Sequence, residues 1–274
     1  MIELPEAVVL AKQLTDTFAG KTIRNVIAVH TTHKLTWYFG DPQEYGALLT
    51  GKVVDGATSY GGQVEIAAGD ARVTFSDGVN LRYFAQGEKP PDKHQLLLEL
   101  DDGSFLVGSV QMYGGLSAFR EGENDNKYYL VAKEKPSPLT AGFNEAYFES
   151  LFCADTDKLS LKAFLATEQR IPGIGNGVLQ DILFNARMHP KKKVASISVA
   201  ERTALLDSIG GTLSEMVAAG GRDTDNDLFG RPGGYSTKLS KNTAGQPCPV
   251  CGGSIQKEAY MGGSVYYCPK CQVL

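Results

Sequence analysis

The residues with the clearest chemistry are four cysteines near the end of the chain. Cys248 and Cys251 form one CxxC pair, Cys268 and Cys271 form a second, and 16 residues separate the pairs. This spacing is typical of a zinc ribbon, in which two hairpin turns present four thiolates to one tetrahedral ion. It disfavours an iron–sulfur site, which uses other spacings. The pattern predicts one structural Zn²⁺ ion, whose simplest role is to stabilise a chain end too small to bury a core.

A second motif that could bind a ligand is the glycine-rich segment 171–177, Ile-Pro-Gly-Ile-Gly-Asn-Gly, which precedes an apolar helical pattern. Glycines let the backbone approach a ligand closely, and free N–H groups at a helix N-terminus attract phosphate. Gly175 and Asn176 are therefore candidate phosphate-binding residues. The alternative is a purely structural turn between packed helices. The lysine run 191–193 either adds positive charge to this face or is a solvated surface.

The composition is that of a globular protein. The 274 residues are 42% hydrophobic and 21% charged, and no stretch approaches the roughly 18 apolar residues of a membrane span. The first residues carry Glu3 and Glu6 and no basic segment, unlike a signal peptide. We therefore expect a cytoplasmic monomer with reduced thiols and no membrane partner, in which the fifth cysteine, Cys153, is a buried core thiol.

The charges are distributed unevenly along the chain. The formal net charge is −4, but residues 1–150 contain 13 Lys and Arg against 20 Asp and Glu, whereas residues 151–274 contain 14 against 11. Phosphate binding requires a local basic surface rather than a basic chain. The second half of the chain is therefore the half that could bind a nucleic acid.

The elements that must position these groups change type along the chain. Residues 3–19 show the apolar spacing of an amphipathic helix. Short β-type runs then follow to about residue 134, and tight turns are expected at Asp77-Gly78 and Asp101-Asp102-Gly103. Such a series favours a β-sandwich or barrel. The runs cover residues 22–29, 52–59, 63–67, 95–100 and 104–110.

Helical patterns dominate after a proline-containing linker at residues 133–138. The last of them begins with a capping-box pattern at Ser198 and Glu201. Residues 221–245 are rich in Gly, Asp, Asn, Thr and Ser, which predicts a long mobile loop. Within it, Arg222 and Arg231 are candidates for ligand contact or for simple solvation, and His30, His33 and His94 are expected in surface or capping roles. The helical patterns cover about 144–153, 160–168, 177–186 and 199–219.

Four features in this order resemble one known family. They are the ELPE start, the β-rich first half, GIGNG leading into DILFNARMHP, and the closing CPVC…YYCPKCQ. The chain resembles the formamidopyrimidine-DNA glycosylase and endonuclease VIII family over essentially its whole length. The resemblance implies an α+β multidomain protein: an N-terminal β-sandwich domain with a leading helix over residues 1–134, a helix–two-turn–helix DNA-binding domain over 135–245, and the zinc ribbon over 246–274.

The resemblance also implies a function. Family members excise damaged bases from double-stranded DNA after flipping the nucleotide out of the stack. The N-terminal amine attacks the sugar C1′, and the resulting Schiff base lets the backbone be cleaved by elimination. Glu3 matches the family's catalytic glutamate, Glu6 a second acidic residue of the same helix, and Asn176 the asparagine that binds a backbone phosphate. Such a protein would be of bacterial type and associated with the nucleoid when bound to DNA.

Several positions depart from the family pattern. The usual proline nucleophile is replaced by Ile2, so the terminal amine is expected on a retained Met1, one residue further along. Gln63 falls where a hairpin lysine is usual, and Gly263 where the zinc hairpin usually has a phosphate-binding arginine. Met112 and Tyr113 match the residues that fill the space of the flipped base, and an arginine is missing there.

Three functions remain open on the sequence alone. The first is a DNA glycosylase with abasic-site lyase activity, which uses the terminal amine and Glu3. The second is a non-catalytic protein that binds damaged DNA or DNA structures, which kept the fold and lost the nucleophile. The third is an RNA-binding or protein-binding role for the helices and the ribbon. The lesion preference does not follow from the sequence.

Overall fold

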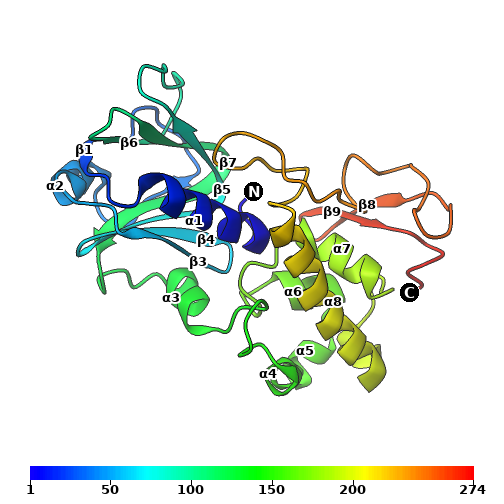
Figure 1. Cartoon of the computed structure of the whole chain (residues 1–274). Coiled ribbons are helices and arrows are strands. Elements are labelled where there is room, and N and C mark those ends of the chain that lie inside the picture. The colour runs from blue at the N-terminus through cyan, green and yellow to red at the C-terminus, as the bar shows by residue number, and fades with distance from the viewer.

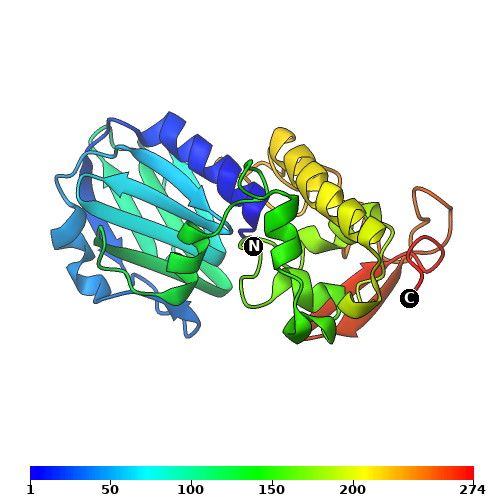
Figure 2. The same ribbon diagram turned by 90° about the horizontal axis from the view of Figure 1, so that it is seen from below.

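The computed structural model describes all 274 residues. Helix α1 (Leu4–Phe18) lies between the two halves of the molecule and contacts both. The helix packs against strands on one side and against the long helix α8 (Val199–Ala218) on the other (Figures 1 and 2). Glu3 and Glu6 form a capping box at its start, and the apolar residues Leu10, Leu14 and Phe18 give it a buried face. The predicted N-terminal helix is confirmed.

The β-rich half is a sandwich whose two layers share their longest strands. The strand order is β1-β6-β7-β5-β4-β3, with β2 beside β7. The first half of β5 pairs with β4 and the second half of β7, whereas its second half pairs with the first half of β7. The layers enclose a 26-residue core that includes Val64, Phe75, Leu98 and Leu116. The strands are β1 (Ile23–Ala28), β2 (Thr36–Trp37), β3 (Gly56–Tyr60), β4 (Gln63–Ala68), β5 (Ala71–Phe84), β6 (Leu96–Leu100) and β7 (Phe105–Arg120).

The prediction of a tight turn at Asp77-Gly78 is wrong, because β5 continues through this dipeptide. The ladder shifts register between Asp77 and Val79, and residues 111–113 of β7 leave the ladder opposite. Asp77 has a φ of 58°, so the Asp-Gly signal marks a β-bulge rather than a hairpin. The other expected turn, residues 101–103, does connect β6 to β7. The bulge bends the sheet where β5 and β7 pass from one layer to the other.

The helical half has its own core of 20 buried residues, which includes Phe148, Phe164, Leu179 and Leu213. Its predicted helices are present, and the capping box of α8 is confirmed. Residues 127–134 form a helix that the sequence pattern missed, because the preceding segment reads as β structure. The remaining helices are η1 (Pro42–Glu44), α2 (Tyr45–Leu49), α3 (Lys127–Glu134), α4 (Glu145–Ser150), α5 (Ala154–Asp157), α6 (Leu161–Ala166), α7 (Val178–Asn185) and η2 (Val194–Ser196).

Two expectations about single side chains are wrong. Cys153 is exposed rather than a core thiol, because it lies at the N-cap of α5, where the chain turns at the surface. His94 is buried rather than on the surface. Its ring stacks on that of His30 at 4.3 Å, and its Nδ1 lies 2.8 Å from the carbonyl oxygen of Pro91. Neither residue lies in a pattern that would distinguish an exposed position from a buried one.

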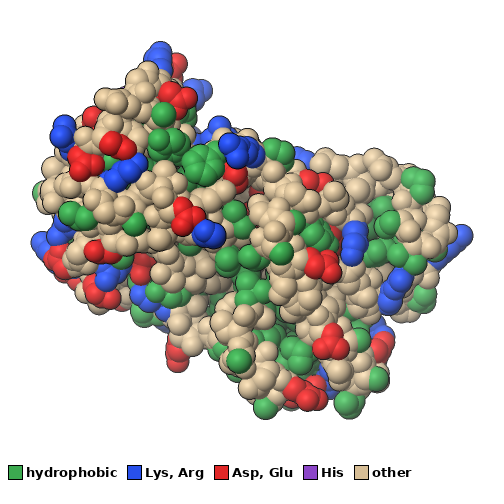
Figure 3. Space-filling model, in the orientation of Figure 1, with side chains coloured by type: hydrophobic (Ala, Val, Ile, Leu, Met, Phe, Trp, Pro, Cys, Tyr) green, Lys and Arg blue, Asp and Glu red, His purple; other side chains and the backbone are tan.

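The chain ends in the hairpin of β8 (Gln256–Tyr260) and β9 (Gly263–Tyr267), at the far end of the helical half (Figure 1). Residues 221–245 contain no helix or strand, but they bury the side chains of Arg222, Leu228, Tyr235 and Leu239. The segment therefore packs against the protein. No helix has the length and apolar character needed to cross a membrane. On the face seen in Figure 3, Lys and Arg side chains are scattered among Asp and Glu side chains.

Candidate functional site at the N-terminus

The first residues of the chain lie beside two glycine-containing turns, one at Gly61 and one at Gly173. The Ile2 N–H donates to the Asp77 carbonyl at 2.6 Å, and the Leu4 N–H donates to the Gly173 carbonyl at 2.9 Å. A Cβ on Gly173 would lie 2.6 Å from the carbonyl carbon of Gly61, in the turn between β3 and β4. Any larger residue at position 173 would push the turns at Gly61 and Gly173 apart. The glycines therefore let the sandwich, the helical half and the N-terminus meet at one place.

Glu3 is buried at this meeting point. Its Oε1 accepts a hydrogen bond from the Gly177 N–H at 2.8 Å, and its Oε2 accepts one from the Val178 N–H at 2.7 Å. Burial raises the pKa of Glu3, while the nearby Arg222 guanidinium and these two N–H groups oppose that rise. A Cβ on Gly175 would lie 2.6 Å from the carboxylate. The N-terminus of α7, which the sequence analysis identified as a candidate phosphate site, therefore binds the Glu3 carboxylate.

Arg222 binds both glutamates of the first helical turn. Its Nε and Nη2 donate to the two carboxylate oxygens of Glu6 at 2.9 and 2.6 Å, and its Nη1 lies 3.4 Å from Glu3 Oε2. The side chain is only 3% exposed, so it is neither solvated nor open to a ligand. A Cβ on Gly177 would lie 1.7 Å from Nη1. The glycine-rich segment therefore makes room for this buried charge cluster.

The N-terminal ammonium of Met1 forms an ion pair with Asp225. The other carboxylate oxygen of Asp225 accepts from the Thr224 hydroxyl at 2.9 Å and lies 3.3 Å from Arg222 Nη2. Burial works against the charged form of Asp225, but Arg222 and the terminal ammonium outweigh it and lower its pKa. A single short segment, residues 222–225, therefore contacts Glu3, Glu6 and the terminal amine.

The bulge of β7 lies beside the amine. The Tyr113 hydroxyl is 3.7 Å from the Met1 sulfur, and its ring is 5.8 Å from that of Trp37. Burial, with the Asp77 and Glu3 carboxylates, raises the pKa of Tyr113. Met112, the neighbouring bulge residue, is 68% exposed. The structure thus brings two of the sequence-predicted residues to the edge of the site.

Gln63 and Gly263 lie in different parts of the fold, in the β-rich half and in the C-terminal hairpin. Gln63 follows the β3–β4 turn and donates from Nε2 to the Tyr128 carbonyl at 3.1 Å. Gly263 begins β9, and a Cβ there would lie 3.6 Å from both Asn176 Nδ2 and Lys162 Nζ. Asn176 Nδ2 donates to the Ser264 carbonyl at 3.0 Å. The turn that contains Asn176 therefore contacts the cysteine hairpin directly.

Lys162 is a cation that sequence reasoning missed. It is buried, donates from Nζ to the Tyr260 carbonyl at 2.6 Å, and has a pKa that burial lowers. By contrast, the lysine run 191–193 is engaged elsewhere. Lys191 pairs with Glu258, Lys192 pairs with Glu201, and Lys193 donates to a backbone carbonyl. The run therefore bridges neighbouring elements, and no motif in the sequence singles out Lys162.

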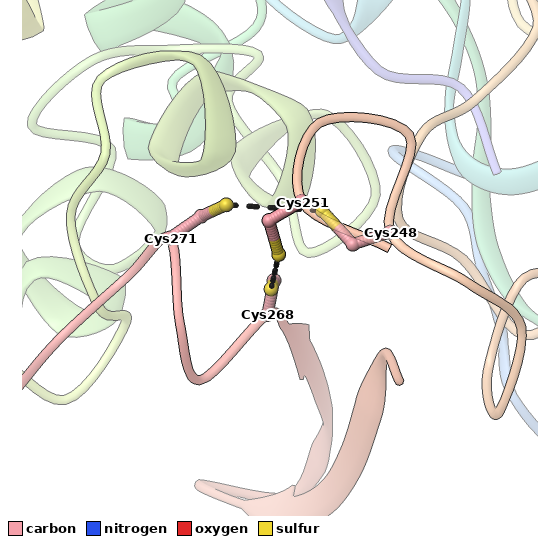
Figure 4. Close-up of side chains that lie close together, drawn as sticks. All are labelled: Cys248, Cys251, Cys268 and Cys271. Atoms are coloured by element: carbon pink, nitrogen blue, oxygen red, sulfur yellow. Dashed lines mark hydrogen bonds between the residues drawn. The ribbon is translucent and has the colours of Figure 1, made fainter. Parts of the chain in front are cut away.

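The four cysteine sulfurs lie within 4.8 Å of one another (Figure 4). Cys251 Sγ is 3.4 Å from Cys268 Sγ, and Cys248 Sγ is 3.8 Å from Cys271 Sγ. A tetrahedron with zinc–sulfur bonds of about 2.3 Å requires sulfur–sulfur separations of about 3.8 Å. The turns before β8 and after β9 thus build a site for one structural zinc ion. No other group of His, Cys, Asp and Glu side chains converges in this way.

Two family models match the chain. Residues 135–227 match the formamidopyrimidine-DNA glycosylase H2TH domain, and residues 245–273 match the zinc finger found in FPG and IleRS. Formamidopyrimidine-DNA glycosylase of Aliivibrio fischeri (strain MJ11) is 29% identical, over 100% of this chain and 99% of its own. The Geotalea daltonii enzyme of the same name is 27% identical, over 99% and 100%.

Solved structures have the same fold from end to end. The MutM (Fpg) protein of Thermus thermophilus aligns with a TM-score of 0.81 at 23% identity, over 98% of each chain. Lactococcus lactis Fpg, solved in complex with abasic-site DNA, aligns with a TM-score of 0.85 at 23% identity, over 99% of this chain and 100% of its own. The two domain matches, the full-length relatives and this shared fold together support the formamidopyrimidine-DNA glycosylase and endonuclease VIII family as the family that this chain resembles.

Proposed function

We propose that this protein binds double-stranded DNA at damaged or abasic nucleotides and acts in base excision repair as a DNA glycosylase with abasic-site lyase activity. The observation that carries the proposal is the arrangement at the N-terminus, where a buried carboxylate and the terminal amine are organised by one segment. Supporting it are the names of the full-length relatives and the abasic-site DNA in the Lactococcus lactis complex.

The proposed chemistry uses groups of this chain alone. The free Met1 amine attacks the sugar C1′ of a flipped nucleotide, and the bond from C1′ to the base breaks. Glu3 protonates the opening sugar ring oxygen and afterwards moves protons during elimination. A buried carboxyl with a raised pKa suits this role, because it holds a proton more readily than an exposed glutamate. The terminal amine must lose its proton before it attacks.

The proposed DNA interface follows the edges of the same site. Exposed Met112, together with Tyr113, would occupy the space left by the flipped nucleotide. Asn176 would exchange its bond to the Ser264 carbonyl for a phosphate oxygen, with Gly175 allowing close backbone approach. The zinc hairpin would contact the duplex at Gly263. In this interpretation, residues 1–134 and 135–245 act as two domains on either side of the DNA, with the ribbon at 246–274.

A second candidate is a protein that binds damaged DNA without cutting it. The observation in its favour concerns the nucleophile: the position of the usual proline is Ile2, whose side chain is buried, and the Met1 amine is already paired with Asp225. Gln63 and Gly263 also lack the charges that would hold phosphates. This candidate predicts tight binding to an abasic duplex and no product at any protein excess.

Base release by a Glu3→Gln variant distinguishes the two candidates. We expect the substitution to lower the rate of base release from a duplex with an oxidised base by about 100-fold or more, because a glutamine cannot transfer the proton. DNA affinity should change little. Asp16→Asn, on the exposed part of the same helix, is the matched control. Equal base release by Glu3→Gln and by the parent would exclude the proposed mechanism.

A further inference from the structure

The terminal amine and the buried glutamates are contacted by two residues of one short segment, Asp225 and Arg222. Asp225 pairs with the Met1 ammonium, and Arg222 Nη2 lies 3.3 Å from Asp225 and 3.5 Å from the Met1 carbonyl oxygen. Arg222 also binds Glu3 and Glu6. The position of the amine is therefore coupled to the charges behind it, and no motif in the sequence indicated this contact.

An amine held as an ammonium ion cannot act as a nucleophile, because its lone pair carries a proton. Asp225 stabilises that protonated form by direct contact. Its own charge is stabilised by Arg222 and by the Thr224 hydroxyl, so Asp225 does not readily take the proton itself. The pair therefore fixes the position of the amine beside a carboxylate.

We propose that Asp225 is a positioning residue that holds the terminal amine in its protonated form until a bound ligand separates the pair. The proposal rests on the proposed function, since the ligand is the aldehyde of an abasic deoxyribose in duplex DNA. When the pair separates, the ammonium loses its proton to water, and the nitrogen bonds to the aldehyde carbon. The carbonyl oxygen then leaves as water, which gives the Schiff base.

The remaining groups around the amine do not replace Asp225. The Asp77 residue contacts the N-terminus through its backbone carbonyl, and Tyr113 contacts the Met1 sulfur. Glu3 and Glu6 are bound by Arg222 and by backbone N–H groups. The charged and titratable groups that face the N-terminus are Glu3 and Glu6 of α1, Asp77 of β5, Tyr113 of β7, and Arg222 and Asp225 of the segment after α8.

The first test measures the reactivity of the amine without DNA. The full-length protein is treated with formaldehyde and cyanoborohydride between pH 6.5 and 9, and methylation of the N-terminal peptide is followed by mass spectrometry. Asp225→Asn should increase the labelling rate at pH 7 by about two- to fivefold, the range of a partly exposed ion pair. The increase should disappear at high pH, where the parent amine is also unprotonated.

The matched control is Asp223→Asn. Asp223 lies two residues earlier in the same segment, and its side chain accepts only from Thr237. A second variant, Thr224→Val, removes the hydroxyl that orients Asp225 and should give a smaller increase in the same direction. Labelling of Asp225→Asn and Thr224→Val at the parent's rate across the whole pH range would overturn the proposal.

Trapping on abasic DNA separates this proposal from the proposed function. With borohydride and an abasic duplex, Asp225→Asn should form the N-terminal adduct faster than the parent at pH 7, and Asp223→Asn should not. If no protein forms an adduct but the labelling difference remains, the proposed function fails and the role of Asp225 stands. If adducts form at equal rates in all three proteins, Asp225 has no such role.

Discussion

At the scale of single residues, the Arg222 guanidinium pairs with the buried carboxylates near the N-terminus. Arg222 lies between Glu3 and Glu6, with a side chain that is 3% exposed. Two carboxylates so close and so deeply buried repel one another unless a positive charge separates them. Arg222 offsets that repulsion and opposes the rise in the pKa of Glu3 that burial causes.

Replacing Arg222 tests how much of the site depends on it. Arg222→Met should lower the free energy of unfolding by roughly 3–5 kcal/mol, because it leaves buried carboxylates without a partner. Chemical denaturation measures this loss. Glu6→Gln in the same chain should recover part of it. Arg231→Met is the matched control, since Arg231 is exposed in the same segment, and it should change stability by about 0.5 kcal/mol or less. Equal losses for the two arginines would contradict the account.

The sequence predicted the residues that belong to motifs, but it did not predict the roles of those that act through tertiary contact. Glu3, Glu6 and the four cysteines lie in short patterns whose chemistry is legible from spacing. Arg222, Asp225 and Lys162 do not, because their burial depends on elements more than 80 residues away in the chain. The segment around Arg222 and Asp225 reads as an ordinary polar loop, and Lys162 lies in an apolar helical pattern that contains no motif.

At the scale of elements, the bulge of β5 determines where the β7 residues lie. Gly78 is in this bulge, and a Cβ on it would lie 2.4 Å from the Tyr113 carbonyl oxygen. The close approach of the two strands holds residues 111–113 out of the ladder beside the N-terminus. The Asp-Gly pair was visible in the sequence, but its partner strand was not. A bulge and a hairpin turn therefore could not be distinguished.

Adding one methyl group at the bulge tests this account. Gly78→Ala should lower the free energy of unfolding by about 1–3 kcal/mol, because the clash is with backbone and β7 must move. The fluorescence of Trp37, the single tryptophan, should change because its ring packs near Tyr113. Gly210→Ala is the control: nothing lies within 4 Å of that Cβ position inside α8, so stability should rise by about 0.5–1 kcal/mol. A neutral Gly78→Ala would argue against the role of the bulge.

At the scale of the whole molecule, the zinc hairpin is linked to the N-terminal site through Asn176 and to the helical half through Lys162. Both residues donate to carbonyl groups of the hairpin, at Ser264 and Tyr260. Phe184, Leu239 and Ile255 pack against Cys248 and Cys268 in a small hydrophobic core. Metal loss is therefore expected to affect DNA binding as well as the chain end.

Chelation of zinc tests this link. Before chelation, a thiol reagent should modify Cys153 alone, because it is exposed and lies outside the metal site. After chelation all five cysteines should react, and affinity for an abasic duplex should fall. Cys153→Ser provides a background without the surface thiol. Rapid modification of the ribbon cysteines in the zinc-loaded protein, or unchanged DNA affinity after chelation, would contradict the expected structural role.

The family fold was predictable from the order of the motifs along the chain, and the departures at Ile2, Gln63 and Gly263 were equally visible. What the motifs could not supply was the contact between Asp225 and the terminal amine. The most direct test is borohydride trapping of the protein on an abasic duplex, followed by mass spectrometry of the N-terminal peptide. The account predicts a covalent adduct on the terminal amine. Tight binding without any adduct would contradict it and leave a protein that recognises damaged DNA without cutting it.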